Sequence, residues 1–240
     1  MMRLTWSRLG TIILAGFIGL PALATVDQAL IAGGWQEITF DGKDANRFAP
    51  DTSGGISVLS DNSVSLIQMP IDVDLSKTPL LSWRWQVAKP APPSDLSAKG
   101  KDDRSLALYV AFPFVPEEAS AFERFRRSVV EAIAGERAPG RVLTYVWGGN
   151  GERGERVRSP YLGDSGMITI LRPASATAGQ WFDETVDIAE DYRRVFGSSA
   201  PDPVSIAIGS DSDDTLSLVE GVIADVGFIA PPDLSNEAAN

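Results

Sequence analysis

Residues 80–87 read LLSWRWQV, and this stretch decides the fold class. Apolar side chains occupy the odd positions from 81 to 87, and polar side chains occupy positions 82, 84 and 86. Because successive side chains of a strand point to opposite faces of a sheet, this alternation predicts a half-buried β-strand. Trp83 and Trp85 are then expected in the core, with Arg84 and Gln86 on the opposite face.

Short stretches of this kind recur along the chain and are separated by polar turns. The 22 glycines and 16 prolines favour short strands with many turns over long helices. Residues 106–112 are apolar throughout, which predicts a central strand buried on both faces. The sequence therefore predicts an all-β fold, an antiparallel β-sandwich of about ten strands. The expected strands are residues 35–40, 56–59, 64–69, 80–87, 106–112, 142–147, 167–171, 181–186, 204–208 and 222–228.

Two stretches have the periodicity of helices instead. Residues 117–134 follow Pro116 and carry apolar side chains at helical spacing, which predicts one helix inserted between strands. Residues 188–196 end at Gly197, a residue type that commonly follows the last turn of a helix. This second stretch predicts a short helix at the lip of the sandwich.

The first 24 residues have the three parts of a secretory signal peptide. Arg3 and Arg8 come first, an apolar run over residues 9–20 follows, and Ala22-Leu23-Ala24 offers a small-x-small cleavage site. The apolar run is shorter than the roughly 20 residues that a membrane span needs, so no membrane span is expected in the mature chain. We therefore expect a signal peptide over residues 1–24, one sandwich domain over 25–229 and a disordered polar tail over 230–240. The product would be periplasmic or secreted from a bacterium.

Composition excludes several classes of function. The chain contains no histidine and no cysteine, which excludes zinc sites of the usual kind, Ser–His–Asp and Cys–His catalysis, and disulfides. The formal net charge of −11 repels the phosphates of nucleic acids, so no nucleic-acid partner is expected. An enzyme of this composition would have to use carboxylates, Lys, Tyr, Ser or Thr, or a metal held by oxygen ligands.

Carboxylates gather beside two of the apolar strands. Asp102 and Asp103 precede residues 106–112, whereas Asp211 and Asp213 follow residues 204–208. Clustered carboxylates at strand ends can hold Ca²⁺, and the alternative is ordinary turn chemistry, since Asp favours turns. We expect at least two of the four to converge near Arg84, with Arg84 or Ca²⁺ compensating their charge. Asp211 and Asp213 are the candidate metal ligands, and the sequence implies no other cofactor.

Polar and aromatic residues supply the candidates for ligand binding. Arg84 in mid-strand must be solvated or paired, either with a carboxylate of the chain or with an anionic ligand. Trp147 and Tyr161 would stack on sugar rings if exposed and would belong to the core if buried, and burial is expected for Trp181. The candidate ligand-binding residues are Arg84, Gln86, Trp147, Tyr161, Asp102 and Asp103.

A series of blocks, in this order, resembles the bacterial exported proteins of domain-of-unknown-function family 3047. The resemblance covers residues 35–228 and implies a jelly-roll sandwich akin to carbohydrate-binding modules, with no established activity and no catalytic residue to carry over. The blocks are LSWRW at 81–85, KDD at 101–103, LTYVW at 143–147, SPY at 159–161, GQW at 179–181, DYRRVFG at 191–197, IAI at 206–208, DSDDT at 211–215 and ADVGF at 224–228.

The function expected from the residues and the resemblance is that of an exported, non-enzymatic binding module for a glycan or another polar ligand. One alternative is a carboxylate-dependent hydrolase of an envelope or exported polysaccharide, which would need two carboxyl groups about 5–9.5 Å apart across a cleft. The other is an envelope accessory factor that binds a protein through an exposed apolar patch.

Overall fold

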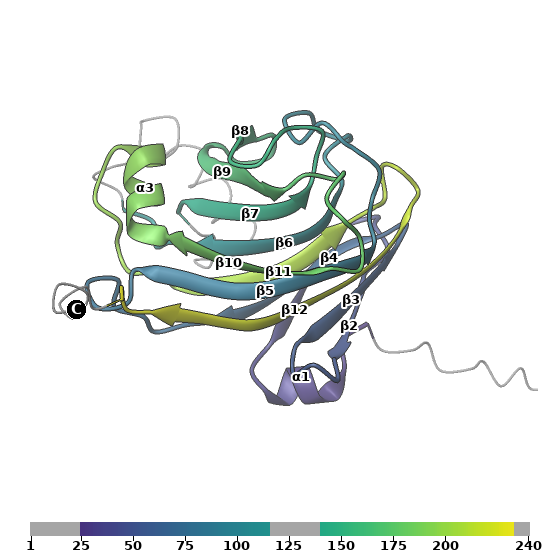
Figure 1. Ribbon diagram of the computed structural model, residues 1–240, viewed down its shortest axis with the longest axis horizontal. Coiled ribbons are helices and arrows are strands. Elements are labelled where there is room, and N and C mark those ends of the chain that lie inside the picture. Colours follow the sequence, from purple (N-terminus) through teal and green to yellow (C-terminus); the bar gives the residue numbers. More distant parts are fainter. Residues whose placement is uncertain (1–24, 116–139, 233–240) are drawn as a thin grey trace, which may run out of the picture.

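The computed structural model describes residues 25–115 and 140–232, which form a jelly-roll β-sandwich of two sheets (Figure 1). The expected signal peptide, the expected inserted helix and residues 233–240 of the expected tail lie outside these ranges. The larger sheet contains, in spatial order, β1 (Gln36–Thr39), β4 (Val64–Pro70), β11 (Ser205–Asp211), β6 (Arg104–Ala111), β7 (Val142–Gly148), β9 (Gly163–Arg172) and β8 (Arg156–Ser159). The smaller sheet contains β10 (Trp181–Asp187), β5 (Leu80–Lys89), β12 (Leu218–Ile229), β3 (Ile56–Asp61) and β2 (Arg47–Pro50).

The all-β prediction is confirmed, and the expected strands lie within the two sheets. Two strands were not expected from the sequence, namely β2 and β8, each four residues long. β2 ends in a proline and β8 alternates charged with less polar residues, so neither carries the apolar signal of a strand. Within the described residues the paired strands are antiparallel apart from β7 and β9, which run parallel.

The core lies between the two sheets and is built around tryptophans. Along β5 the burial alternates residue by residue, and Trp83 and Trp85 are fully buried, as the sequence predicted. The two rings pack edge to face at 5.4 Å, and Trp85 packs in the same way on Trp147 of β7 at 5.9 Å. The two-sided burial expected for residues 106–112 is also confirmed, because Leu106 faces this core and Ala107 faces a second apolar cluster.

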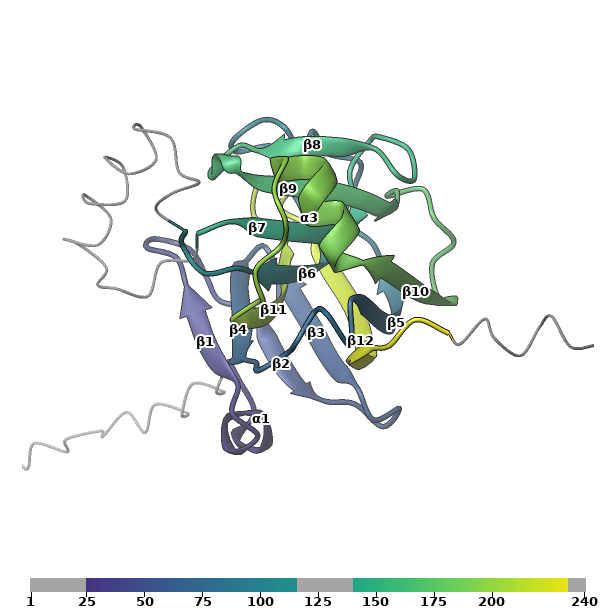
Figure 2. The same ribbon diagram turned by 90° about the vertical axis from the view of Figure 1, so that its left-hand side faces the viewer.

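Two helices flank the sandwich within the described residues, α1 (Gln28–Ala32) and α3 (Ile188–Phe196). α3 has the bounds predicted for the lip helix and lies across one end of the sandwich (Figure 2). The Asp187 carboxylate accepts a hydrogen bond from the Glu190 amide at 2.8 Å, and Gly197 ends the helix with φ at 78°. No helix in residues 25–115 and 140–232 has the length and apolar character needed to cross a membrane.

Candidate functional site

A β-bulge in β6 places one arginine at the centre of a polar network. Arg104 is paired with Gly148 of β7, yet Leu106 is paired with Trp147, so β6 holds one extra residue at this point. Strict alternation would put Arg104 on the core face with Leu106. The bulge turns it to the opposite face, where its Nε donates to the Tyr109 hydroxyl at 3.2 Å. A Cβ on Gly148 would lie 2.9 Å from the Arg104 Cα, so this close approach requires glycine.

Two buried carboxylates hold the Arg104 guanidinium. Its Nη1 donates to Oδ2 of Asp102 at 3.0 Å and to the Asp102 carbonyl at 2.6 Å, and its Nη2 lies 3.3 Å from Oδ2 of Asp211. Burial acts to lower the pKa of Arg104, but Tyr109, Asp211 and Asp102 outweigh it and raise the pKa above its usual value. Arg104 is therefore a permanent positive charge at the end of β6 and β11. We call Asp102, Arg104, Tyr109 and Asp211 the Arg104 network.

Asp103 anchors the loop between β11 and β12 to the start of β6. Its Oδ2 accepts hydrogen bonds from the Thr215 amide at 2.7 Å and from the Thr215 hydroxyl at 2.5 Å. The Asp214 amide lies 3.3 Å from its Oδ1. These neutral donors order the loop between β11 and β12 against the start of β6. They bring no positive charge to the buried Asp103 carboxylate.

Asp211 is the most perturbed carboxylate of the cluster. Burial raises its pKa from 3.8 to about 7, Arg104 opposes the shift, and Asp103 and Asp102 add to it. Its Oδ1 is buried and has no hydrogen-bond partner among the described residues. Asp213, two residues later, forms an ion pair with Lys43. One ligand oxygen from each of Asp103, Asp211 and Asp213 lies within 4.8 Å of the others. Asp103, Asp211 and Asp213 thus converge as the sequence predicted, although not near Arg84.

Tyr161 lies over the Arg104 network and faces solvent. Its side chain is 55% exposed, and its hydroxyl donates to Oδ1 of Asp102 at 3.3 Å. Lys99 approaches the ring, with Nζ at 5.4 Å from the centroid. Burial of the hydroxyl raises the pKa of Tyr161, and the charge of Asp102 adds to the effect. The result is an exposed aromatic ring whose polar end is anchored in a buried ion-pair network.

Arg84 does not lie near these carboxylates, so the predicted location of the cluster is wrong, and Arg84 is excluded as one of the two compensating charges that the sequence left open. It lies on β5 of the smaller sheet, where its Nε pairs with Oδ2 of Asp225 at 2.7 Å and its guanidinium lies 4.8 Å from the ring centre of Trp181. The cluster lies at β6 and β11 in the other sheet, and Arg104 is its arginine. Gln86 also stays with the smaller sheet, because its Nε2 donates to the Gly179 carbonyl at 2.5 Å. The predicted ligand-binding residues are therefore split between two surfaces.

The two tryptophans differ from their expected roles. Trp147 is fully buried against Trp85 and Phe182, which leaves no ring surface for a ligand. It is a core residue, and its candidacy for ligand binding is wrong. Trp181 is half-buried beneath Arg84 on the outer face of the smaller sheet, where burial in the core was expected.

Sequence reasoning also missed Arg104 itself. The apolar run over residues 106–112 gives no sign that a bulge before it will turn the arginine side chain to the other face of the sheet. The available signal is the tripeptide Asp102-Asp103-Arg104, which places a cation directly beside two acids where they enter a buried strand. A charge that cannot enter the core unpaired has to be met by such neighbours.

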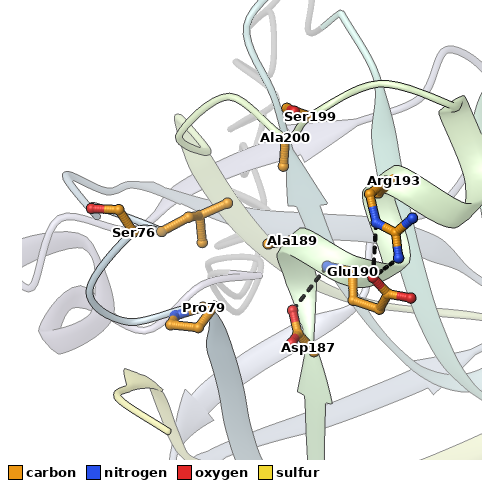
Figure 3. A pocket seen from close by; sticks show the side chains of 9 residues that line it. Ser76, Pro79, Asp187, Ala189, Glu190, Arg193, Ser199 and Ala200 are labelled. Carbon is orange, nitrogen blue, oxygen red and sulfur yellow. Dashed lines mark hydrogen bonds and ion pairs between the residues drawn. The ribbon is translucent and has the colours of Figure 1, made fainter.

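A surface pocket of about 390 Å³ lies elsewhere, beside the first turn of α3 (Figure 3). Its charged side chains are occupied by local contacts. Asp187 caps the helix, and Glu190 accepts hydrogen bonds from Arg193 Nε at 3.0 Å and Arg194 Nε at 2.6 Å. With its charges paired inside the helix, this pocket is a weaker candidate site than the Tyr161 surface.

The family model for the protein of unknown function DUF3047 matches residues 33–227. The chain belongs to this family. No curated protein matches the DUF3047 chain in sequence.

Three solved structures resemble it in fold. The first is the family 11 carbohydrate-binding module of the cellulosomal cellulase Lic26A-Cel5E of Clostridium thermocellum, with 12% identity, TM-score 0.44, and 96% of this chain and 100% of that chain covered. The same organism's family 11 module in complex with a β-1,3-1,4-mixed-linked tetrasaccharide gives 12% identity and TM-score 0.43, covering 83% and 91%. The xyloglucanase domain of NopAA, a type three effector from Sinorhizobium fredii in complex with cellobiose, gives 11% identity and TM-score 0.45, covering 82% and 93%.

Proposed function

We propose that this protein is an exported, non-enzymatic binding module for a glycan, and that the sugar lies on Tyr161. The observation that carries the proposal is the exposed Tyr161 ring, 55% accessible, with its hydroxyl bonded to a carboxylate of the buried Arg104 network. An exposed, anchored aromatic ring costs little conformational entropy when it binds, because its orientation is already restricted.

Polar groups beside the ring suit the hydroxyls of a sugar. The second oxygen of Asp102 is bonded to Arg104, and Lys99 brings an ammonium group over one face of the Tyr161 ring, 5.4 Å from its centroid, which leaves the other face for a sugar. Charged donors and acceptors form stronger hydrogen bonds than neutral ones, and a sugar hydroxyl can donate to one and accept from the other. The net charge of −11 repels polyanions, so the proposal commits to a neutral glycan.

Export is part of the proposal and is supported by the basic, apolar and small-residue pattern of residues 1–24. Protein recovered from the periplasm should begin at Thr25 when its N-terminus is sequenced. Periplasmic or secreted protein that retains Met1 would contradict this part of the proposal.

One observation favours the alternative of a carboxylate-dependent hydrolase. The Asp211 pKa of about 7 would keep a proton on a carboxyl group close to other carboxylates, as an acid and base pair requires. The Asp211 side chain is only 9% exposed, however, so a scissile bond would not reach it. The hydrolase alternative predicts new reducing ends when the protein is incubated with a polysaccharide, and the binding module predicts none.

Affinity electrophoresis tests the proposed function. The full mature chain should be retarded in gels that contain a soluble neutral β-glucan, and much less in gels that contain a polyuronate. Tyr161→Ala should raise the Kd that is derived from the retardation by at least about tenfold, because aromatic anchors dominate such interfaces. Tyr161→Phe retains the ring and should lose less.

Two variants show whether the site is correctly placed. Ile31→Ala removes an exposed apolar side chain on α1 and should leave retardation unchanged. Trp181→Ala tests the rival surface of Arg84 and Gln86 on the smaller sheet, and it should also bind as the wild type does. Loss of binding in Trp181→Ala with normal binding in Tyr161→Ala would move the site to the smaller sheet. Absence of retardation in every gel would contradict glycan binding.

A further inference from the structure

We propose that the carboxylates of Asp103, Asp211 and Asp213 bind a divalent cation, Ca²⁺, where β6 begins and β11 ends. This site adjoins the Tyr161 surface through Asp102 and Arg104, but the proposal does not rest on glycan binding. One oxygen from each of the three residues lies within 4.8 Å of the others, and the Asp103 and Asp211 side chains are buried. The three residues come from two segments that are distant in the sequence and adjacent in the larger sheet.

The strongest sign of a ligand is an unsatisfied atom of Asp211. Its side chain is 9% exposed, and its Oδ2 faces Arg104, but its Oδ1 has no partner within residues 25–115 and 140–232. A buried carboxylate oxygen without a hydrogen bond is costly, and such atoms are rare in folded proteins. A cation between the three carboxylates would supply the missing partner.

Charge balance points the same way. Asp102, Asp103, Asp211 and Asp213 carry four negative charges when ionised, and the positive groups paired with them in the described chain are Arg104 and Lys43. Arg104 is shared between Asp102 and Asp211, whereas Asp103 receives neutral donors from Thr215 and the backbone. With all four carboxylates ionised the deficit is two charges, which a divalent ion removes and a hydrogen-bonded water would leave in place.

The ligand chemistry selects the ion. All three ligands are carboxylates and the chain holds no histidine or cysteine, which suits the hard ions Ca²⁺ and Mg²⁺. Ca²⁺ binds oxygens at about 2.3–2.6 Å, so it accommodates ligands up to about 5 Å apart, whereas Mg²⁺ at about 2.0–2.1 Å spans only about 4 Å. A separation of up to 4.8 Å suits Ca²⁺ without movement of the buried β6 and β11 backbones.

Lys43 occupies the solvent-facing side of the proposed site, where its ammonium group neutralises one carboxylate in the absence of an ion. Its ammonium group pairs with Asp213, and its side chain is 43% exposed on the segment that follows β1. A lysine side chain is long and flexible, so Lys43 can withdraw into solvent when an ion arrives. Lys43 therefore competes with Ca²⁺ for Asp213. Removing Lys43 should therefore strengthen Ca²⁺ binding, whereas removing a ligand carboxylate should weaken it.

Calorimetry on the full chain, first treated with a chelator and then freed of it, tests the site. CaCl₂ should bind with a stoichiometry of one and raise the Tm, and MgCl₂ should bind more weakly, because a ligand that binds only the folded state stabilises it. Asp213→Asn and Asp211→Asn should each weaken Ca²⁺ binding at least tenfold. Lys43→Met should strengthen it several-fold.

Matched controls separate a specific site from general charge effects. Asp183→Asn removes an exposed acid from β10, and Lys89→Met removes an exposed lysine from β5, so both should bind Ca²⁺ as the wild type does. If Asp211→Asn fails to fold, the more accessible Asp213→Asn still decides the question. Absence of Ca²⁺ binding in the wild type would overturn the proposal, and so would binding that neither ligand variant weakens. Retardation by β-glucan, measured in chelator, tests the glycan proposal separately.

Discussion

Two buried charge clusters in this sandwich are balanced in opposite ways. At Glu184 of β10, one carboxylate meets two arginines, with Arg172 Nε at 2.5 Å and Arg153 Nη2 at 2.8 Å, and Trp85 Nε1 donates at 3.2 Å. At the Arg104 network, one arginine meets Asp102 and Asp211, and Asp103 lies beside them without a cationic partner in the described part of the chain.

The difference separates a structural cluster from the proposed cation site. Glu184 has more positive charge than it needs, and both of its oxygens are bonded. The carboxylates around Asp211 have less positive charge than they need, and one buried oxygen is unbonded. A buried ion pair that is fully satisfied can serve the fold alone, whereas an unsatisfied buried oxygen needs an explanation, for which we propose a cation. Burial alone would not have distinguished the two clusters.

Replacing Arg104, the arginine of the cluster that has too little positive charge, should have the largest effect on stability. Arg104→Met leaves buried Asp102 and Asp211 without their cation, and breaking a buried pair in this way costs about 3–5 kcal/mol. Urea unfolding of the purified protein measures this loss. A loss below about 1 kcal/mol would show that the carboxylates are not held by Arg104.

Replacing the Glu184 carboxylate, which has two arginine partners, should lower the free energy of unfolding by a smaller amount. Glu184→Gln retains the shape of the side chain, and the Arg153 side chain left behind is 52% exposed and can turn into water. We expect a loss of about 1.5–3 kcal/mol, the value of a hydrogen bond to a charged group. If Glu184→Gln proves as damaging as Arg104→Met in the same urea experiment, the comparison between the clusters fails.

The response of stability to calcium should sharpen the comparison. Glu184→Gln lowers the Tm but should leave the increase caused by Ca²⁺ intact, because Glu184 is not a ligand of the proposed site. Asp213→Asn should abolish the increase while changing the Tm in chelator only slightly, since the amide keeps the shape of the side chain and its partner Lys43 is 43% exposed and can turn into water. Differential scanning fluorimetry with CaCl₂ and with chelator measures both. Equal calcium responses in the two variants would contradict the assignment of the ligands.

The smallest effect on stability is expected at Tyr161, the exposed residue that contacts the Arg104 network. Tyr161→Phe removes one hydrogen bond at 3.3 Å to Asp102, which retains Arg104 as its partner. We expect a loss of stability of at most about 1 kcal/mol. Urea unfolding should therefore rank Tyr161→Phe after both Arg104→Met and Glu184→Gln. A larger loss would mean that Tyr161 stabilises the fold and is not free to serve a ligand.

Features governed by regular periodicity could be predicted from the sequence. The alternation along residues 80–87 placed Trp83 and Trp85 in the core, and the bounds of α3 followed from helical spacing and Gly197. The convergence of Asp103 with Asp211 was predicted because both flank apolar strands, and the structure brings it about by pairing β6 directly with β11.

Features that depend on irregular backbone could not be predicted. The extra residue in β6 reverses the face of Arg104, and no local pattern announces it. A second irregularity in β12, between Ala224 and Gly227, brings Asp225 with φ at 56° to Arg84, so that Arg84 is paired within the smaller sheet. Both failures have one physical cause, since a single additional residue in a strand exchanges its inward and outward faces.

Diffraction from crystals grown with calcium tests the central claim most directly. Anomalous difference density, measured at a long wavelength, should show one strong peak between the carboxylates of Asp103, Asp211 and Asp213, with Lys43 withdrawn from Asp213. The Glu184 cluster should show no peak. A map with no peak at the three carboxylates, in crystals where calcium is present and the site is open to solvent, would contradict the claim that a cation balances the carboxylates beside the Arg104 network.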